Sequence, residues 1–319
     1  MPLVVRLLAQ RIALGLVLLF LVSALIFAGT NILPGDVAAS ILGQSATPEA
    51  LANLRRDLGL NEPALTRYFN WLGGALTGDL GTSLASGLDI ATEIGKRLGN
   101  TLFLAFWAAV VAVPLAIFLG LLAVRFRERW PDKLISAVTL ASISIPEFLI
   151  GYILMFVVGV QLQWFFPTAI AFRADADLLT KLDAIALPIA VLTLVVLAHM
   201  MRMTRAAILN VMQSAYIETA ELKGLRSMTI IRRHAFPNAI APIVNVVMLT
   251  LDNLVVGVVV VEVVFVYPGM GQYLVDHVSK RDIPVVQACG LIFAAVYIGL
   301  NMIADIVSIL ANPRLRHPK

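Results

Sequence analysis

The chain has 319 residues, of which 60% are hydrophobic and only 14% are charged, and its formal net charge is +4. Soluble domains average about 45–50% apolar and about 25% charged residues, and one such domain could not bury this much apolar surface. These figures exclude a soluble, disordered or fibrous protein and leave a polytopic membrane protein. The single cysteine, Cys289, excludes an internal disulfide and a thiolate metal cluster.

Six stretches are long and apolar enough to cross a bilayer, which takes about 20 apolar residues in a helix. They are residues 12–33, 101–124, 134–160, 185–201, 239–266 and 285–310. The fourth is short, and we expect its helix to continue past Arg202 into water. The first follows Arg6 and Arg11 and could be a cleaved signal peptide, but its length and the lack of a small-residue cleavage site favour a retained span.

Basic residues predict the orientation of the spans. With both termini in the cytosol, the inner segments carry 15 of the 24 Lys and Arg residues and 4 acidic residues. The outer loops then carry the other 9 basic residues and 12 acidic ones. The reverse orientation would place the positive excess outside, so we expect both termini to be cytosolic.

The long outer segment 34–100 has the signals of two helices. Thr47 is a typical N-cap with Pro48 at the first helical position, and Gly59 can end that helix. A second amphipathic stretch follows, and its apolar face consists of Leu65, Tyr68, Phe69 and Leu72. Two helices lying on the outer membrane surface and a platform that meets an external partner are equally open interpretations.

The inner segment between the fourth and fifth spans predicts two short helices. Gly224 is a natural end for the first helix, and Ser227 can N-cap the second. Pro237 stands close to the start of the fifth span. The small residues Thr219 and Ala220 allow another surface to approach the first helix closely.

The spacing in this segment resembles the "EAA" loop of ATP-binding-cassette (ABC) importer permeases. That pattern is Glu-Ala-Ala, three residues, Gly, nine residues and Ile-x-Leu-Pro. Four positions match it, Glu218, Ala220, Gly224 and Pro237, and three depart from it, Thr219, His234 and Phe236.

Further motifs, in the same order along the chain, look like the dipeptide/oligopeptide permease B subfamily. They are Leu33-Pro34-Gly35-Asp36, Leu58-Gly59-Leu60, Gly78-Asp79-Leu80-Gly81-Thr82-Ser83, Ser144-Ile145-Pro146, Glu262 with Pro268-Gly269-Met270-Gly271, Arg281-Asp282-x-Pro284, and the tail Asn312-Pro313-Arg314-Leu315-Arg316. The resemblance therefore covers nearly the whole chain.

The resemblance implies an all-α, polytopic inner-membrane protein with six transmembrane helices, a large outer loop and a cytosolic coupling helix, in the fold of type I ABC importer transmembrane domains. It divides the chain into an inner N-terminus and first span (1–33), an outer loop (34–100), a five-span core (101–310) that includes the coupling loop (202–237), and a cytosolic tail (311–319). The implied partners are a second homologous permease of the C type, two ATP-binding subunits, an external solute-binding protein and the lipid bilayer, with no nucleic acid.

The implied function is that of a permease subunit of a binding-protein-dependent importer for dipeptides or oligopeptides. The same machinery for nickel chelates, glutathione, opines or oligosaccharides is an alternative. An ion-coupled secondary transporter is an alternative of another class; it would be expected to have an inverted repeat, which the sequence lacks. An intramembrane enzyme is a third possibility, but the sequence contains no paired catalytic motif that supports it.

We do not expect the chain itself to be an enzyme or to bind a cofactor or metal. A phosphate-binding loop needs Gly, four residues and Gly-Lys-Ser/Thr, and the sequence contains no such motif. ATP and Mg²⁺ would therefore be used by the partner ATPases.

The resemblance also assigns residues to the contact with the ATPase. They are Glu218, Thr219, Ala220, Gly224, Arg226 and Pro237. At the other side of the membrane, Glu262 with Pro268, Gly269 and Gly271 is predicted to structure an outer gate or turn. Trp164, Phe165 and Phe166 are typical of an aromatic belt at the outer interface.

Two acidic residues, Glu147 and Asp252, fall near the middle of their predicted spans. A charged side chain at the bilayer centre costs about 2.5–3.5 kcal/mol on insertion scales. Lining a wet translocation path is one interpretation, and it would favour substrates with an amine or other positive charge. Pairing within a permease dimer and protonation in a dry site are the alternatives. Pro146, next to Glu147, is the best candidate for a functional kink.

Overall fold

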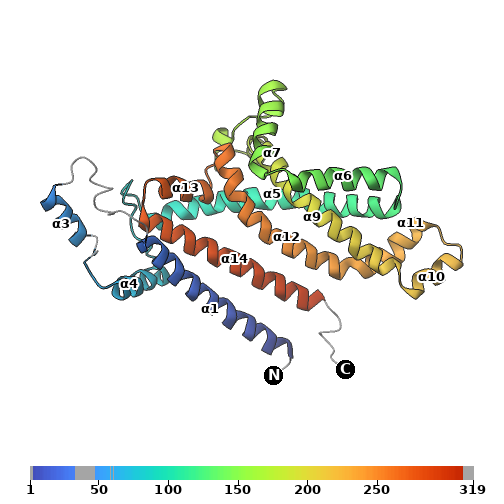
Figure 1. The fold of residues 1–319 in the computed structure, drawn as a ribbon, viewed down its shortest axis with the longest axis horizontal. Coiled ribbons are helices and arrows are strands. Elements are labelled where there is room, and N and C mark those ends of the chain that lie inside the picture. The colour runs from blue at the N-terminus through green and yellow to red at the C-terminus, as the bar shows by residue number, and fades with distance from the viewer. Residues whose placement is uncertain (1–2, 33–46, 58, 60, 312–319) are drawn as a thin grey trace. The chain divides into compact units, whose positions relative to one another are not determined.

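The computed structural model describes residues 3–32, 47–57, 59 and 61–311, and these residues form helices joined by short turns (Figure 1). The helices are α1 (Leu3–Ile32), α3 (Pro48–Asp57), α4 (Ala64–Thr77), α5 (Ile90–Arg125), α6 (Trp130–Ser144), α7 (Glu147–Leu154), η2 (Met155–Gln161), η3 (Ala169–Ala171), α8 (Leu178–Ala184), α9 (Ala186–Met212), α10 (Ala215–Leu222), α11 (Ser227–Ile230), η4 (Ile231–Ala235), α12 (Phe236–Phe265), α13 (Met270–Ser279) and α14 (Ile283–Ala311). Of these, η2 and η4 are π-helices and η3 is a 3₁₀-helix. The predicted all-α fold is confirmed.

Five helical stretches among the described residues are long and apolar enough to cross a membrane. They are Ala9–Ile32, Ile90–Arg125, Ala186–Met212, Ser227–Leu251 and Ile283–Val307. Two further helix pairs pass the same test only together, Trp130–Ser144 with Glu147–Gln161 and Gly257–Phe265 with Met270–Ser279. Counting each bent pair as one span gives up to seven candidates.

The third predicted span, residues 134–160, is not one straight helix. It breaks into α6 and α7, whose axes meet at 105°, and α7 turns away from α6 in Figure 1. Proline lacks an amide hydrogen and disfavours helical backbone in the residue before it. Ile145 accordingly has extended backbone angles (φ −99°, ψ 128°), and α7 begins after Pro146. The expected kink at Pro146 is therefore confirmed, and it is large.

Two predicted spans belong to longer helices. The helix containing 101–124 begins at Ile90, where the Asp89 carboxylate accepts a hydrogen bond from the Thr92 amide (2.8 Å) and caps it. The short fourth stretch continues as α9 to Met212, past Arg202, as expected.

The chain divides into two compact units. Unit 1 comprises the described residues within Met1–Leu8, Thr101–Pro268 and Leu300–Lys319, and unit 2 comprises those within Ala9–Asn100 and Gly269–Gly299. Each unit has buried clusters of its own and is described separately below.

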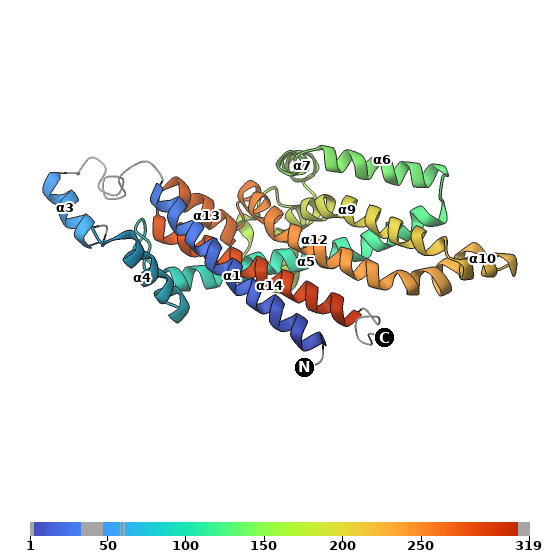
Figure 2. The same cartoon turned by 60° about the horizontal axis from the view of Figure 1, so that its bottom comes forward.

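In unit 1, α9 and α12 lie side by side, as both Figure 1 and Figure 2 show. Their shared core includes Leu192, Val196 and Val258, all at most 3% exposed. Helix α5 packs closely on α9, because a Cβ added to Gly120 would lie 2.9 Å from the Thr204 Cγ2 atom. Small residues at such positions let helix backbones approach each other inside a membrane.

In unit 2, α4 packs on α1. Tyr68 is 6% exposed, shares a hydrogen bond of 2.8 Å with the Ser23 hydroxyl and meets Phe27 edge to face. Of the predicted apolar face of this helix, only Tyr68 is buried, whereas Leu65 and Phe69 are 73% and 59% exposed. Helix α14 reaches α1 through Gln287, whose amide donates to the Thr30 hydroxyl (2.7 Å).

The local helix signals of the outer segment are confirmed. The Thr47 hydroxyl accepts a hydrogen bond from the Ala50 amide (3.2 Å) at the start of α3. Gly59 follows the helix with a φ of +63°, in the left-handed region that glycine adopts readily. The motif at residues 33–36, two residues of the motif at 58–60 and the tail motif at 312–316 lie outside the described residues.

Candidate coupling segment and membrane sites

Helix α10 is anchored by one face and presents the other face to solvent. Ile217 and Ala220 are buried, at 0% and 7% exposure, in a cluster with Ile230 and Ile231. The opposite face exposes Glu218, Thr219, Glu221 and Leu222. Glu218 and Thr219 are thus free for contact with another protein, whereas the predicted contact residue Ala220 faces inward and holds the helix in place.

Gly224 ends α10 with the geometry of a Schellman motif. Its φ is +76°, its amide donates to the Glu221 carbonyl (2.8 Å), and the Leu225 amide donates to the Ala220 carbonyl (3.3 Å). No atom outside its chain neighbours lies within 4 Å of a Cβ added at Gly224. Glycine is required here by the backbone conformation and not by crowding, so the surface at this point is open.

The second short helix runs directly into the next membrane helix. The predicted N-cap at Ser227 is wrong, because Arg226 is the N-cap residue and its side chain makes no capping bond. Helix α11 continues through the π-helix η4 into α12, and Pro237 lies in the first turn of α12. The π-helical turn η4 immediately precedes the turn that holds Pro237, and the helix continues through the proline without a break.

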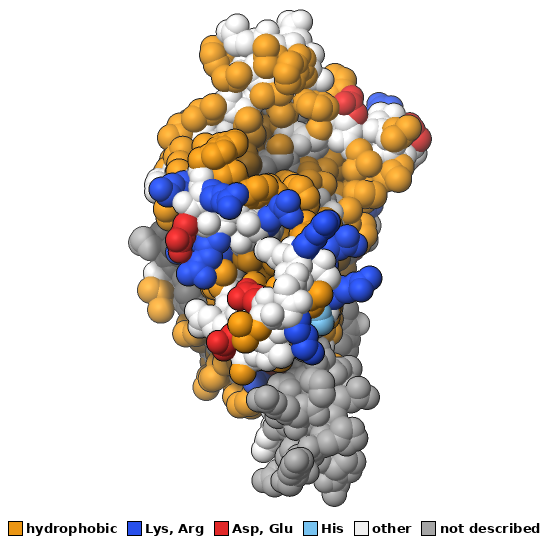
Figure 3. Space-filling model, turned by 90° about the vertical axis from the view of Figure 1, so that its right-hand side faces the viewer, with side chains coloured by type: hydrophobic (Ala, Val, Ile, Leu, Met, Phe, Trp, Pro, Cys, Tyr) orange, Lys and Arg blue, Asp and Glu red, His pale blue; other side chains and the backbone are white. Residues whose placement is uncertain are grey.

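Basic side chains surround α10. Figure 3 looks at the end of unit 1 that carries α10 and α11, where Lys and Arg side chains gather around a few acidic ones. The exposed basic residues of this end are Arg125, Arg127, Arg129, Lys133, Lys223, Arg226, Arg232 and Arg233. Arg226, predicted as a contact residue, belongs to this group, which we call the basic end.

A buried ion pair lies behind the basic end and was missed by sequence reasoning. Asp132, 4% exposed, accepts two hydrogen bonds from the Arg205 guanidinium, to Oδ1 (3.0 Å) and to Oδ2 (2.8 Å). It also accepts the Glu128 amide (3.0 Å), in a turn where Glu128 has a φ of +63°. The pair joins the start of α6 to α9, the helix that directly precedes α10 in the chain.

The structure describes the side chain of only one of the two predicted membrane acids. Glu147 is the first residue of α7, is partly exposed and lies next to Gly257 of α12. Asp252 is within α12, but its side chain lies outside the described part of the chain. Whether the two acids share a passage therefore stays a prediction.

Glu262 is fully buried near the end of α12. Its carboxylate accepts a hydrogen bond from the Thr101 hydroxyl (2.6 Å), and its carbonyl accepts the Tyr267 amide (2.9 Å). Val266 caps the helix with a φ of +54°, which is rare for a β-branched residue. Glu262 thus supports the turn that leads to Pro268. Gly269 is the N-cap residue of α13, and Gly271 lies buried in its first turn.

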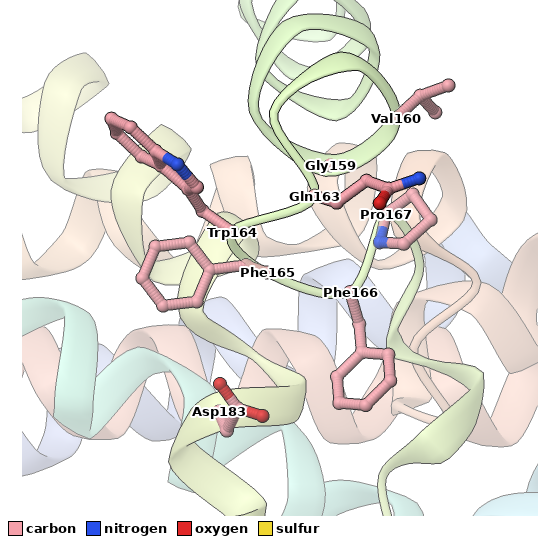
Figure 4. A pocket seen from close by; sticks show the side chains of 8 residues that line it. All are labelled: Gly159, Val160, Gln163, Trp164, Phe165, Phe166, Pro167 and Asp183. Carbon is pink, nitrogen blue, oxygen red and sulfur yellow. The ribbon is translucent and has the colours of Figure 1, made fainter.

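A hollow of about 510 Å³ lies beside η2 (Figure 4). Trp164, Phe165 and Phe166, the predicted aromatic belt, line it together with Asp183 of α8. A Cβ on Gly159 would lie 2.7 Å from the Pro167 Cα atom, so a glycine lets the turn fold back against η2. Trp164 is 69% exposed, and the position of these rings at a membrane surface stays a prediction.

Comparison with known proteins gives matches over almost the whole chain. The model of the family "Binding-protein-dependent transport system inner membrane component" matches residues 112–317, and the model of the corresponding N-terminal component matches residues 4–104. The glutathione transport system permease proteins GsiC of Escherichia coli O6:H1 and of Shigella boydii serotype 4 are each 36% identical over 299 residues, which cover 94% of this chain and 95% of theirs. A solved structure of the MetNI methionine ABC transporter in an inward-facing conformation matches with a TM-score of 0.50 and 18% identity. That match covers 70% of this chain and 96% of the other, and it supports the fold.

Proposed function

Because the chain belongs to the family of binding-protein-dependent transport system inner-membrane components, we propose that its α10 segment receives the stroke of a partner ATPase and that its solute is a short peptide. Membership of this family establishes the general function of the chain. The chain is a multi-pass inner-membrane permease subunit of an ABC importer, and it is not itself an enzyme. An ATPase and a solute-binding protein are the partners that such a permease requires.

The coupling proposal rests on one observation, which is that one face of α10 is exposed while the other packs against the protein. Glu218, Thr219 and Gly224 face solvent, while Ile217 and Ala220 connect the helix to the buried cluster that contains α11. Because protein interiors are close-packed and transmit displacement, a push on α10 moves α11 and, through η4, α12. Arg226 and the rest of the basic end would add polar contacts to the ATPase.

The basic end also supports a cytosolic position for α10. Cytoplasmic segments of membrane proteins carry an excess of Lys and Arg, and this end of unit 1 has eight exposed basic residues, named above. We propose accordingly that both termini are cytosolic. The further partners would be a second permease of the C type and two ATP-binding subunits, which would hold ATP and Mg²⁺ while this chain binds neither.

A peptide solute is supported by the relatives. The GsiC relatives are named as glutathione transport permeases, and glutathione is itself a tripeptide. Glutathione is therefore the most specific candidate, within the wider class of dipeptides and oligopeptides. We also propose that Glu147 and Asp252 line the passage and that Glu262, Pro268, Gly269 and Gly271 shape its outer turn.

The experiment that tests the coupling proposal replaces Gly224 with tryptophan in the assembled importer. Position 224 has open space around it, so Gly224→Trp is expected to insert and assemble with the second permease but to lose ATPase copurification and solute-stimulated ATP hydrolysis. Gly87→Trp is the matched control, because Gly87 is also exposed, also has a positive φ (+70°) and also lacks neighbours within 4 Å. Normal ATPase binding and stimulation in Gly224→Trp would contradict the proposal.

A further inference from the structure

Glu147, in the first turn of α7, lies on the face of this helix that packs against the protein, where an apolar side chain is the usual choice. Ile150, Gly151 and Leu154 of this helix pack into the core of unit 1, and a Cβ on Gly151 would lie 3.1 Å from Val264 of α12. Residues three, four and seven positions apart share one helix face. Glu147 is the next member of this face, so its side chain is directed toward α12 and α9 and not toward the lipid-exposed side.

A glycine makes room for this carboxylate. The Glu147 Oε2 atom lies 3.2 Å from where a Cβ on Gly257 would be, and Leu192 Cδ2 lies 3.7 Å from the same point. A methyl group at position 257 would crowd the oxygen, because so close a contact is tighter than ordinary van der Waals packing. Gly257 is buried in α12. Because this residue has no side chain, it leaves the space against α12 that the carboxylate occupies, and we call this space the seat.

Within the described residues, the Glu147 carboxylate has no hydrogen-bond or ion-pair partner. The two buried acids among the described residues of unit 1 both have partners. Asp132 binds Arg205, and Glu262 accepts the Thr101 hydroxyl. An unpartnered carboxylate in a membrane-spanning segment is costly and marks a functional site by default. The described residues thus leave this carboxylate available to a positive charge or a hydrogen-bond donor of another molecule.

We propose that the Glu147 carboxylate, seated against Gly257, is a binding site for the ammonium group of the solute as it crosses the membrane. This inference rests on the proposed transport function. A single carboxylate suits a monovalent ammonium group, which it can meet with one charge-assisted hydrogen bond. The described residues contain no group of three or more His, Cys, Asp or Glu side chains that could hold a metal ion.

Protection of Glu147 from a carbodiimide tests the site without requiring transport. The assembled importer in phosphatidylglycerol nanodiscs, which supply no ammonium group, is treated with dicyclohexylcarbodiimide, and the adduct at Glu147 is measured by mass spectrometry. A primary amine can also displace the urea from the activated carboxyl and form a butylamide, so the adduct and the butylamide at Glu147 are counted together. We expect n-butylammonium to lower this summed yield about fivefold relative to the neutral alcohol n-butanol. Glu147→Gln serves as the blank for the labelled peptide.

Two variants separate the seat from the charge. Gly257→Ala keeps Glu147 but requires its carboxylate to shift by a few tenths of an ångström, so the protection by n-butylammonium should be smaller than in the native chain. Gly299→Ala, at a glycine without neighbours within 4 Å, should keep the full protection. If Gly257→Ala does not assemble, Glu147→Asp replaces it, because the shorter side chain withdraws the carboxylate from the seat while leaving Gly257 unchanged.

Three outcomes would overturn the inference. They are the lack of any adduct at Glu147, equal labelling in n-butylammonium and n-butanol, and protection by phosphatidylethanolamine in the nanodisc with no further effect of the amine. The last outcome would assign the site to a lipid headgroup. Binding-protein-stimulated ATP hydrolysis, measured on the same samples, reports separately on the proposed function, so a failure of the ammonium site is distinguishable from a failure of the importer assignment.

Discussion

Ser83 donates a hydrogen bond of 2.6 Å to the Oδ2 atom of Asp282, which lies 199 residues further along the chain. Both residues are at most 2% exposed. The same carboxylate accepts the amides of Leu84 (3.2 Å) and Ala85 (3.1 Å). In unit 2, Asp282 therefore holds the turn that follows the motif ending at Ser83, and two motifs that are far apart in sequence act as one structural element.

Replacing Asp282 with alanine should destabilise this turn strongly. The substitution leaves two backbone amides and one hydroxyl without their acceptor, and each charge-assisted hydrogen bond contributes about 1.5–3 kcal/mol. We expect a lower thermal midpoint of the purified subunit and faster proteolysis at residues 83–88. Ser83→Ala removes the bond to Asp282 and the bond that the Ser83 hydroxyl accepts from the Ser86 amide (3.0 Å). It leaves the Leu84 and Ala85 amides bound to Asp282, so it should have a smaller effect; an equal effect of the two variants would contradict this account of Asp282.

Breaking the Asp132–Arg205 pair should destabilise the start of α6. Arg205→Met leaves the Asp132 carboxylate buried without a counter-charge, and because Arg205 is 30% exposed we expect a loss of about 2 kcal/mol, below the range for fully buried pairs. The thermal midpoint and the binding-protein-stimulated ATP hydrolysis of the assembled importer measure the effect. The double variant Asp132→Ala/Arg205→Met should be more stable than Arg205→Met alone, and the opposite order would show that the pair is not the cause.

The cap of α5 should depend on pH. The hydroxyl and the backbone amide of Thr92 donate to Asp89 and lower its pKa below the ordinary value of 3.8. A carboxyl group whose pKa is lower in the folded state stabilises the fold above the unfolded pKa, and this contribution is lost as the pH falls through the lowered value. Hydrogen-exchange protection of the Thr92 and Glu93 amides should therefore weaken below about pH 4.

Asp89→Asn is the matched control for this measurement. Asparagine caps helices about as well as aspartate and carries no titrating carboxyl group. The ratio of protection between the native chain and Asp89→Asn should change only in the acidic range, and a constant ratio would show that Asp89 does not act through its charge.

Two glycines of α5 should respond oppositely to alanine. A Cβ at Gly120 would lie 2.9 Å from the buried Thr204 Cγ2 atom, so Gly120→Ala should destabilise the α5–α9 contact by about 1–3 kcal/mol. Gly95 is exposed and without neighbours within 4 Å, so Gly95→Ala should stabilise the helix by about 0.5–1 kcal/mol. The thermal midpoints of the two variants should move in opposite directions, and a shift of both in one direction would contradict the packing at Gly120.

Features that depend on neighbouring residues could be predicted from the sequence. The cap at Thr47, the glycine stops at Gly59 and Gly224 and the kink at Pro146 all follow from the chemistry of one to four residues, and the structure contains each of them. The Ser227 cap failed by a single position, because Ser and Arg at the start of a four-residue helix leave the boundary almost undetermined.

Features that depend on distant residues could not be predicted. Asp132 and Arg205 are 73 residues apart, and a sequence shows each of them only as one more charge near the membrane. The inward orientation of Ala220 and the proximity of Gly257 to Glu147 arise from how α10 and α12 pack. A helix face assigned by spacing alone does not state which neighbour covers it.

The uninterrupted helical run from Ser227 to Leu251 has a mechanical consequence. Its 25 residues span about 37 Å at a rise of 1.5 Å per residue. A tilt of about 5° around Leu251 would therefore move Ser227 by about 3 Å. A small rotation at one end of this run would thus become a displacement at the other end that is comparable to the length of a hydrogen bond.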